Sequence, residues 1–530
     1  MAADRTPSPN IDVCVVGAGP AGALVAAELA GGGHDVVVLD AGQRFDPEEH
    51  EERMETHLRP GKQEPLWGMG GERDAYSASG DRDYPLNAAR VKGIGGTTLH
   101  WQGMVMRLHE QDFRLDSELG VAEDWPISYA DLRPYYAAAE EAFAVAGASD
   151  NPFAPPREQP HPLPAFPPSY SDSLFADACE NLGITTHSVP NARNSEPTAE
   201  ASACVGYGTC KPVCPSGAKY DATRHIDAAE TSGARVLDRV PVQRLEHDAS
   251  GEKVTAAVYA TPDGTEHRQE ADEFVLAAGG VETPRLLLLS ESEQYPDGLA
   301  NSSGAVGRYF MDHLFAGVGG RLNRPTRQKH VGFNTTESHQ FYDRTDADRS
   351  AIKLEFINYA GPAPTDIALG AEEFGDALLA RIREEYGTHI AMGALVEQYP
   401  RAENRVRLDP STTDDHGNPV PDVVWRLDDR TKRTIRRATE IQRSVLEELG
   451  ADIDWVVGPD TTGPAFHHMG TTRMGTDPET SVVNPDLRTH DLANLTIAGS
   501  SAFVTGGAMN PTLTLAALSL KATDAVASRL

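Results

Sequence analysis

Residues 11–42 read IDVCVVGAGPAGALVAAELAGGGHDVVVLDAG and decide the fold. A continuous apolar run predicts a buried strand, and three glycines follow it in G-x-G-x-x-G spacing, Gly17, Gly19 and Gly22. An alanine-rich helix and a second apolar strand come next, and that strand ends at Asp40. Glycines let the backbone approach a pyrophosphate, the helix start supplies N–H donors, and the acid binds a ribose hydroxyl. The stretch therefore predicts an α/β, Rossmann-like domain that binds a dinucleotide.

Further glycine-containing segments lie far from this one. They are RVKGIGGTTLHWQGMVMR (90–107), ADEFVLAAGGVETPRLLLLS (271–290) and NLTIAGSSAFVTGGAMNPTLTLAALSLKATDAVASRL (494–530). The last two read as a buried strand, a small-residue turn and a helix start. Cofactor-type segments spread over the whole chain suit a long flavin dinucleotide better than a compact NAD domain. The sequence thus favours FAD.

The chain is long and strongly acidic. Its 530 residues predict two lobes, and 79 Asp and Glu against 47 Lys and Arg give a net charge of −32. Such a field argues against nucleic acid or anionic membranes as partners and predicts a halophilic surface. The first ten residues lack an apolar targeting core, and no apolar run of about 18 residues occurs. We expect a cytoplasmic protein without a transmembrane segment.

Three of the five cysteines lie in ACVGYGTCKPVCPSGAKY, residues 203–220. Cys204, Cys210 and Cys214 could hold zinc if His225 served as a fourth ligand, or form a disulfide with one thiol left over. Three close thiolates that end in Cys-Pro also resemble ferredoxin runs. Cys14 and Cys179 are interpreted as packing residues.

Two segments near the C-terminus, FHHMGTTRMG and AMNPTLT, contain His467, His468 and Asn510. A neutral imidazole can accept a proton near pH 7, so a histidine in this region is a candidate general base. Successive side chains of an extended segment point in opposite directions, so one of the two histidines should face the reaction.

Taken together, these motifs resemble the glucose–methanol–choline (GMC) oxidoreductases, closest to the FAD-dependent glucose, fructose and gluconate dehydrogenase catalytic subunits. The resemblance implies His467 as base, three residues before Gly470–Thr471, and Asn510 as hydrogen-bond donor to the substrate oxygen. The expected FAD-binding residues are Gly17, Gly19, Gly22, Asp40, Gly95, Gly96, Thr97, His100, Val242, Gly499, Asn510 and Thr512. His100, a site of covalent flavin attachment in some relatives, is expected to bind the flavin noncovalently. The resemblance also implies a 3Fe–4S cluster on Cys204, Cys210 and Cys214.

The family fold implies a Rossmann-like FAD-binding domain in three pieces and an α+β substrate-binding domain with an antiparallel sheet. We expect the FAD-binding pieces at 11–135, 225–319 and 464–530, a linker with the cysteine insertion at 136–224, and the substrate domain at 320–463. Residues 151–168 carry many prolines and predict an extended connector. The basic run from Arg430 to Arg437 predicts a solvated helix face.

The leading functional hypothesis is an FAD-dependent dehydrogenase of a sugar, polyol or sugar acid. It would pass electrons through the cluster to a cytochrome, a quinone or a small redox subunit, and such a subunit would also place it peripherally at a membrane. One alternative is an alcohol oxidase that produces hydrogen peroxide. Another is a flavin-binding protein without turnover, against which the presence of both His467 and Asn510 argues.

Overall fold

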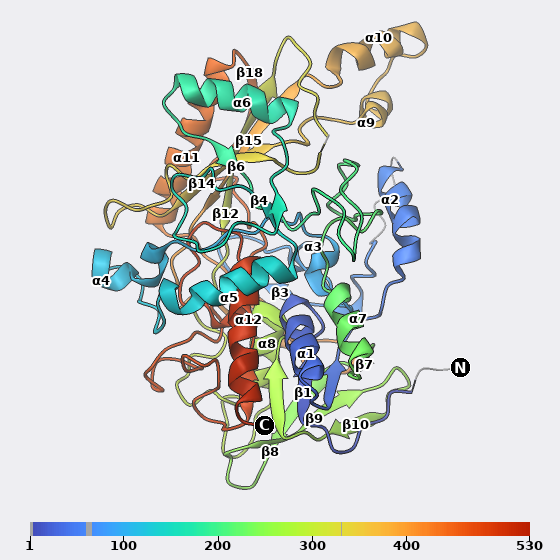
Figure 1. Ribbon diagram of the computed structural model, residues 1–530, viewed down its shortest axis with the longest axis vertical. Helices are drawn as coiled ribbons and strands as arrows, with labels where there is room; N and C mark the ends of the chain where they lie inside the picture. The colour runs from blue at the N-terminus through green and yellow to red at the C-terminus, as the bar shows by residue number, and fades with distance from the viewer. Residues whose placement is uncertain (1–3, 60–65, 330) are drawn as a thin grey trace.

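The computed structural model describes residues 4–59, 66–329 and 331–530. The first three residues of the N-terminal segment considered above lie outside the described residues. Figure 1 shows two lobes, with the N-terminal glycine segment in the lower one and the large antiparallel sheet in the upper one. The FAD-binding fold and the second, antiparallel domain expected from the sequence are both present.

The lower lobe is built on a five-stranded parallel sheet of order β19-β11-β1-β2-β7. Its strands are β1 (Val13–Val16), β2 (Val36–Leu39), β7 (Arg235–Leu237), β11 (Glu273–Leu276) and β19 (Leu495–Ile497). Every residue of β1, β2 and β11 is buried, as expected for a parallel sheet covered on both faces. Strands from the two ends of the chain thus meet in one sheet.

Helices cover this sheet, and a smaller antiparallel sheet adjoins it (Figure 1). The helices are α1 (Pro20–Gly31), α5 (Tyr129–Ala142), α7 (Thr223–Thr231), α8 (Gly279–Leu289) and α12 (Thr512–Ala527). The small sheet has the order β10-β9-β8, with β8 (Val242–His247), β9 (Val254–Ala260) and β10 (Glu266–Gln269). α1 packs against both α7 and α12, so the glycine turn before α1 lies beside the C-terminal segment.

The upper lobe contains a six-stranded sheet of order β18-β12-β15-β14-β13-β6. The strands are β6 (His187–Ser188), β12 (Leu314–Arg321), β13 (Thr336–Ser338), β14 (Ile352–Ile357), β15 (His389–Val396) and β18 (Asp452–Val457). Helix α11 (Asp429–Glu448) packs on β12 and β15 with its apolar face, while Arg436 and Arg437 are exposed, which confirms the solvated basic face. α6 (Tyr170–Asn181) packs against α11.

Segments outside the expected domain limits complete this lobe. β6 and α6 belong to the 136–224 segment, and β12 starts at Leu314, before residue 320. β6 pairs with β13 and supplies hydrogen bonds to an edge that would otherwise stay unpaired. Residues 151–168 are extended and contain only the short β5 (Leu163–Pro164), which pairs with β4 (Ala146–Gly147).

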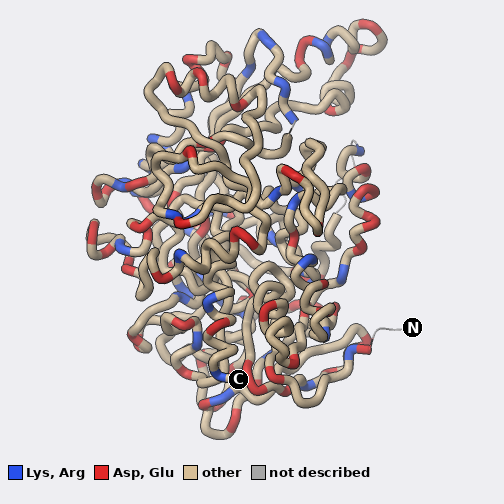
Figure 2. The backbone as a smooth tube through the Cα atoms, viewed as in Figure 1, with Lys and Arg blue, Asp and Glu red and all other residues tan. Residues whose placement is uncertain are grey.

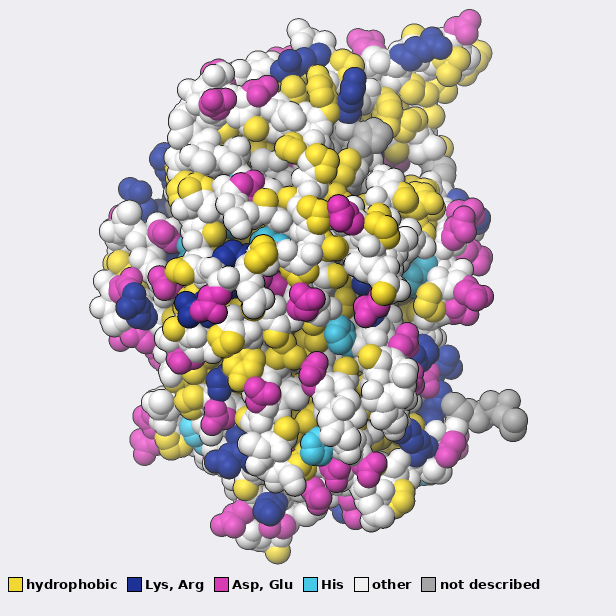
Figure 3. Space-filling view, viewed as in Figure 1, with side chains coloured by type: hydrophobic (Ala, Val, Ile, Leu, Met, Phe, Trp, Pro, Cys, Tyr) yellow, Lys and Arg dark blue, Asp and Glu magenta, His cyan; other side chains and the backbone are white. Residues whose placement is uncertain are grey.

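The remaining elements lie at the surface or join the lobes. A third antiparallel pair, β16 (Arg405–Thr413) and β17 (Pro419–Val424), extends to β3 (Ser77–Ala78). The short helices are α2 (His50–Leu58), α3 (Leu86–Ala89), α4 (Leu115–Leu119), α9 (Pro364–Leu369) and α10 (Asp376–Glu385). α9 and α10 project from the upper lobe, and Figure 3 shows hydrophobic side chains gathered there. Phe374, between these two helices, is 86% exposed.

The placement of the acidic residues and of two cysteines agrees with what the sequence predicted. Acidic residues are spread along the backbone of both lobes in Figure 2 rather than gathered in one segment. Cys14 in β1 and Cys179 in α6 are fully buried, which confirms their interpretation as packing residues. Within the described ranges, no helix combines the length and apolar character that a membrane span requires.

Candidate active site

A cavity of about 370 Å³ lies where the glycine segments meet. All of the predicted cofactor residues line it except Gly22 and Gly95. A Cβ on Gly22 would lie 1.9 Å from the carbonyl oxygen of Gly17, so Gly22 lets α1 pack onto its own turn. Gly95 has a φ of +99° and faces Leu99 and Thr223, so it shapes a turn rather than the cavity wall.

The turn between β1 and α1 leaves room for a phosphate group. A Cβ on Gly19 would meet no protein atom closer than the Cα of Gly96, at 3.9 Å. The start of α1 has no side-chain cap, which leaves its backbone N–H groups available to an anion. At the end of β2, the Asp40 carboxylate accepts the N–H groups of Ala18 and Gly42, each at 2.8 Å. These contacts hold Asp40 at the cavity, and the remaining lone pairs suit ribose hydroxyls. The residues present therefore fit a dinucleotide.

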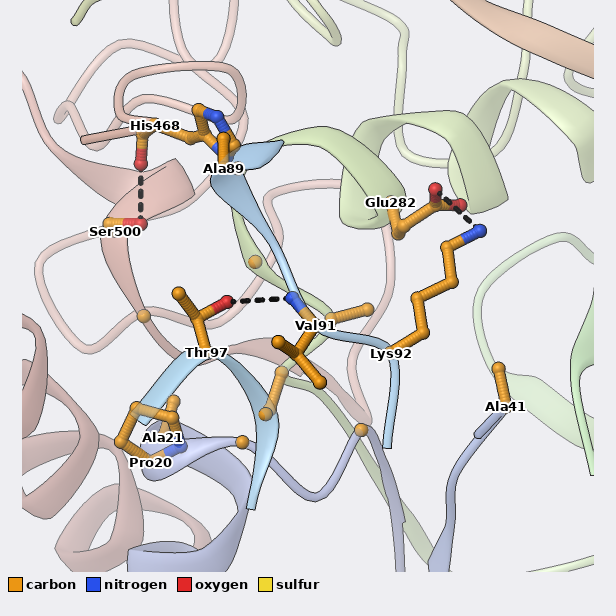
Figure 4. Close-up of a pocket in the computed structure, with 18 of the residues that line it drawn as sticks. Pro20, Ala21, Ala41, Ala89, Val91, Lys92, Thr97, Glu282, His468 and Ser500 are labelled. Atoms are coloured by element: carbon orange, nitrogen blue, oxygen red, sulfur yellow. Dashed lines mark hydrogen bonds and ion pairs between the residues drawn. The ribbon is translucent and has the colours of Figure 1, made fainter. Parts of the chain in front are cut away.

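Charged groups line one end of the cavity (Figure 4). Lys92 Nζ lies 3.1 Å from the Glu282 carboxylate, and Arg90 contacts the same group. These cations hold the pKa of Glu282 well below its usual range despite burial, which opposes them. Figure 4 also shows Thr97, whose hydroxyl accepts the N–H of Val91 at 3.4 Å and ties the second glycine turn to this wall.

The two predicted catalytic residues meet in the cavity. Nε2 of His467 lies 3.4 Å from Nδ2 of Asn510, although the residues come from separate segments. Burial, and after it the neighbouring His313, lowers the pKa of His467 well below its ordinary value. His467 is therefore neutral near pH 7, the state that a base requires.

Hydrogen bonds behind His467 fix which nitrogen carries its proton. Nε2 of His313 lies 2.8 Å from the Gly507 carbonyl and 3.3 Å from that of Gly506, and a carbonyl oxygen only accepts. Nε2 of the neutral His313 thus bears the proton, and its Nδ1 accepts. Nδ1 of His467, 2.8 Å away, must then donate. Nε2 of His467 is therefore unprotonated, and its lone pair accepts the amide N–H of Asn510.

The backbone of His467 is fixed by the residue before His313. Oδ1 of Asp312 accepts the N–H of His467 at 2.8 Å, and Oδ2 accepts that of Phe466 at 3.2 Å and the hydroxyl of Tyr84. Burial raises the pKa of Asp312 to about 7. One dipeptide, Asp312–His313, therefore holds both the backbone and the ring of His467.

The amide of Asn510 is oriented from the upper lobe. Nζ of Lys353, on β14, donates to Oδ1 of Asn510 at 2.6 Å. Because the oxygen is taken by this ammonium, Nδ2 is the group that faces His467. Lys353 is fully buried and also lies 2.8 Å from Glu355 and 3.5 Å from Glu337. The buried cluster of Lys353 with Glu337 and Glu355 thus fixes which atom of the Asn510 amide faces His467.

His468 faces a different environment. Its ring centroid lies 5.7 Å from that of Tyr84 and 5.9 Å from that of Phe310, and its Nε2 has no hydrogen-bond partner among the described residues. Burial lowers the pKa of His468 to about 3. Its carbonyl accepts the hydroxyl of Ser500 at 2.6 Å (Figure 4). The geometry groups His467, and not His468, with Asn510.

Comparison with known proteins identifies the family. Two family models described as GMC oxidoreductase match residues 77–315 and 400–519, and one described as FAD binding domain matches residues 10–51. The chain is 33% identical to the fructose dehydrogenase large subunit of Gluconobacter japonicus, over 98% of each chain. This protein belongs to the GMC oxidoreductase family. It is accordingly an FAD-dependent oxidoreductase that acts on CH–OH groups, as the sequence predicted.

Other relatives agree with this assignment. The GMC chain is 30% identical to 2-methyl-1,2-propanediol dehydrogenase of Mycolicibacterium austroafricanum, over 99% of this chain and 96% of that one. Pyridoxine 4-oxidase from Mesorbium loti has a similar fold, with a TM-score of 0.66 and 19% identity over 97% of this chain and 99% of that one. At that identity the structural likeness concerns the fold alone.

The three clustered cysteines of this GMC protein line one small pocket beside the cofactor cavity. All are free thiols, so the disulfide alternative is not realised. The side chain of Arg193 enters the same pocket, where its Nη1 lies 3.7 Å from the sulfur of Cys204. Nη2 of Arg193 is buried and has no hydrogen-bond partner among the described residues. His225 does not line this pocket, and its Nδ1 contacts the Tyr220 hydroxyl at 2.9 Å.

Two lysines connect the cysteine pocket with the cofactor cavity. Lys211, next to Cys210, lines the cavity itself. Nζ of the fully buried Lys219 donates to the carbonyls of Cys210 at 2.9 Å, Trp101 at 2.8 Å and Leu99 at 3.1 Å. Lys219 thus joins the cysteine segment to the turn that carries His100.

Sequence reasoning missed the residues that position His467 and Asn510. Asp312 and His313 directly precede β12, and Lys353 lies on β14, far along the chain from both His467 and Asn510. The signal available for the first two was an acid–histidine pair, FMDHLF, directly before an apolar strand. For Lys353, the signal was a lysine at a position of β14 where every residue is buried.

Proposed function

We propose that the protein is a dehydrogenase that oxidises a hydroxyl of a sugar, polyol or sugar acid, with His467 as base. The observation that carries this proposal is the neutral His467 with its unprotonated Nε2, which contacts the Asn510 amide in the cavity that fits FAD. The two relatives described above, whose names denote dehydrogenases of a sugar and a diol, support the substrate class.

The protein side chains handle the proton of the reaction. FAD, when bound in the cavity, supplies the acceptor for the hydride. Nε2 of His467 takes the hydroxyl proton of the substrate, and Nδ2 of Asn510 donates a hydrogen bond to the same oxygen. His313 accepts from Nδ1 of His467 throughout, so the imidazolium that forms keeps a partner for its second proton. His100 lines the cavity with a pKa that burial and Lys211 lower to about 3, and we propose that it contacts the flavin noncovalently.

We further propose that Cys204, Cys210 and Cys214 hold a 3Fe–4S cluster. The three thiols line one pocket, and the last of them precedes a proline, as in the cysteine runs that hold iron–sulfur clusters. The unpartnered Nη2 of Arg193 suits the negative charge of thiolate ligands.

The cluster would give the electrons an exit to an external acceptor, a cytochrome, a quinone or a redox subunit. Lys211 and Lys219 connect the segment of the three cysteines with the wall of the cofactor cavity, which supports this electron path. We propose a cytoplasmic enzyme adapted to high salt, in which only a partner subunit would contact a membrane. The net charge of −32, with acidic residues spread along both lobes in Figure 2, supports the salt adaptation.

An anaerobic panel of sugars, polyols and sugar acids, read at flavin wavelengths in high salt, tests the reaction. A substrate of the proposed class should bleach the flavin, and a panel without any bleaching would contradict the dehydrogenase. In air, peroxide production at the full turnover rate would instead support the oxidase alternative.

Cys210→Ser tests the cluster, since oxygen is a poorer soft ligand than thiolate. The variant should lose iron and acid-labile sulfide, still bleach its flavin in one turnover, and fail with a one-electron protein acceptor. Cys179→Ser, a buried cysteine outside the pocket, is the control and should retain iron. Wild-type protein without iron after anaerobic purification would refute the cluster.

A further inference from the structure

A second group of donor side chains is buried at one end of the six-stranded sheet. His187, Glu337 and His339 are at most 4% exposed, and none of them lines the cofactor cavity. We propose that they bind one divalent transition-metal ion, with zinc as the ion that fits best.

The backbone brings the three ligands together. His187 on β6 and Glu337 on β13 are directly paired across the two strands. His339 follows Glu337 by two residues, the spacing that keeps extended side chains on one face. One donor atom from each residue lies within 4.8 Å of the other two. Tetrahedral ligands about 2.0–2.2 Å from a zinc ion lie about 3.3–3.6 Å from each other, so an inward shift of the side chains by about 1 Å completes the site.

His187 is already in the protonation state of a ligand. Its Nδ1 lies 2.9 Å from the carbonyl oxygen of Ser188, which only accepts, so Nδ1 bears the proton. Its Nε2 carries a lone pair, is buried, and has no hydrogen-bond partner among the described residues. A ligating imidazole that donates its other N–H to a carbonyl is the usual arrangement around zinc. An unpartnered acceptor in the interior is costly unless something binds it.

His339 needs only a change of tautomer. Its Nε2 lies 2.8 Å from Oε1 of Glu337, and its Nδ1 lies 2.9 Å from the side-chain amide of Asn151. When the metal takes the Nε2 lone pair and the Glu337 oxygen, the ring proton moves to Nδ1. The Asn151 amide, turned to present its oxygen, then accepts that proton, and its contact with the N–H of Phe153, 2.9 Å before the turn, is given up. No proton is lost in this exchange.

The surroundings favour a cation. Two buried acidic side chains, Glu337 and Glu355, share the single ammonium of Lys353. Nearby, His109 has its ring centroid 6.0 Å from that of His339, and its buried Nε2 also lacks a hydrogen-bond partner among the described residues. Nε2 of His109 can hydrogen-bond a water molecule that acts as the fourth ligand of the metal.

The donor set selects the class of metal. Two imidazoles and one carboxylate suit zinc or ferrous iron, whereas Ca²⁺ and Mg²⁺ prefer oxygen ligands throughout. Full burial on paired strands favours an ion with a structural role. Because Glu337 contacts Lys353 and Lys353 contacts Asn510, the ion would also brace the support of the catalytic amide.

Metal analysis of the FAD-loaded full chain tests this inference. After growth with zinc and brief treatment with a weak chelator, the wild type should contain about one zinc per chain, and His187→Ala should lose it. The matched control is His50→Ala, which removes another buried histidine with an unpartnered Nε2 but no neighbouring ligands. It should retain the zinc, as should Cys210→Ser, so zinc and cluster iron are counted separately.

A second measurement covers the case in which His187→Ala does not fold. Metal-stripped wild type is titrated with Co²⁺, which should produce the visible absorption of a tetrahedral site, and Glu337→Gln should abolish that absorption. Wild type with less than about one-tenth of an equivalent of zinc and no cobalt absorption would overturn the proposal. Full zinc in His187→Ala would overturn it as well.

Discussion

The two walls of the cofactor cavity are built in opposite ways. The wall from the parallel-sheet domain meets the cavity mainly with backbone, at glycine turns such as Gly17, Gly19 and Gly96. The other wall carries His467 and Asn510, and behind them lie the buried ionisable side chains of Asp312, His313 and Lys353; we call this side the ionisable wall. The backbone wall fits the shape of a dinucleotide and binds it through N–H groups. The ionisable wall stabilises one protonation state of the His467 imidazole, the state in which it can act as a base.

The largest effect expected from breaking the ionisable wall comes from His467→Ala. Flavin reduction should slow by about 10²–10⁴-fold, the usual contribution of a positioned base. FAD should stay bound, because the dinucleotide contacts belong to the backbone wall. Stopped-flow bleaching with a saturating substrate measures the rate. His468→Ala is the control, and a larger loss there than in His467→Ala would reverse the assignment.

Gly19→Ala should damage the backbone wall alone. Its Cβ would be 3.9 Å from the nearest protein atom, so the fold accommodates it, but it would occupy space that the dinucleotide needs. We expect FAD affinity to fall by about 10- to 200-fold, with the melting temperature of the FAD-free protein unchanged. Flavin fluorescence and thermal denaturation measure the two quantities.

Gly22→Ala is the matched contrast, since its Cβ would overlap the Gly17 carbonyl at 1.9 Å. It should destabilise the FAD-free protein itself, by about 1–3 kcal/mol as overpacking does. Equal melting temperatures for the two variants would contradict the distinction between a cavity glycine and a packing glycine.

His313→Ala tests the ionisable wall at a residue that contacts the His467 ring. It removes the acceptor of Nδ1–H of His467, a bond that strengthens when the ring becomes an imidazolium. Flavin reduction should slow by about 10- to 100-fold, less than in His467→Ala. His313→Gln, which retains an acceptor, should recover part of the rate. An unchanged rate in His313→Ala would remove the residue from the positioning of the base.

The smallest effect concerns pH. Burial lowers the pKa of His467, so the neutral base persists as pH falls through the ordinary imidazole value. The rate of flavin reduction should therefore change by less than about threefold between pH 8 and 6.5, and decline only at lower pH. A pH series at constant ionic strength tests this, and a midpoint at or above 6.5 would contradict it.

The difference between the two walls also explains which features could be predicted from the sequence and which could not. Strand, glycines and Asp40 are contiguous in the chain and follow local rules, so the cofactor domain and its turn could be anticipated. His467 and Asn510 were recognised through family spacing. Lys353 and His313 act through contacts between residues far apart in the chain, such as the 157 positions between Lys353 and Asn510. No local pattern encodes such a contact, and their neighbours look like ordinary strand residues.

The central claim is that the ionisable wall leaves Nε2 of His467 free to act as base. Nitrogen NMR of the FAD-loaded protein with ¹⁵N-labelled histidine reads the tautomer directly, and His467→Ala assigns the signals. At pH 7 we predict a neutral His467 ring with its proton on Nδ1, and a loss of this single tautomer in His313→Ala. A proton on Nε2, or an imidazolium at that pH, would contradict the account.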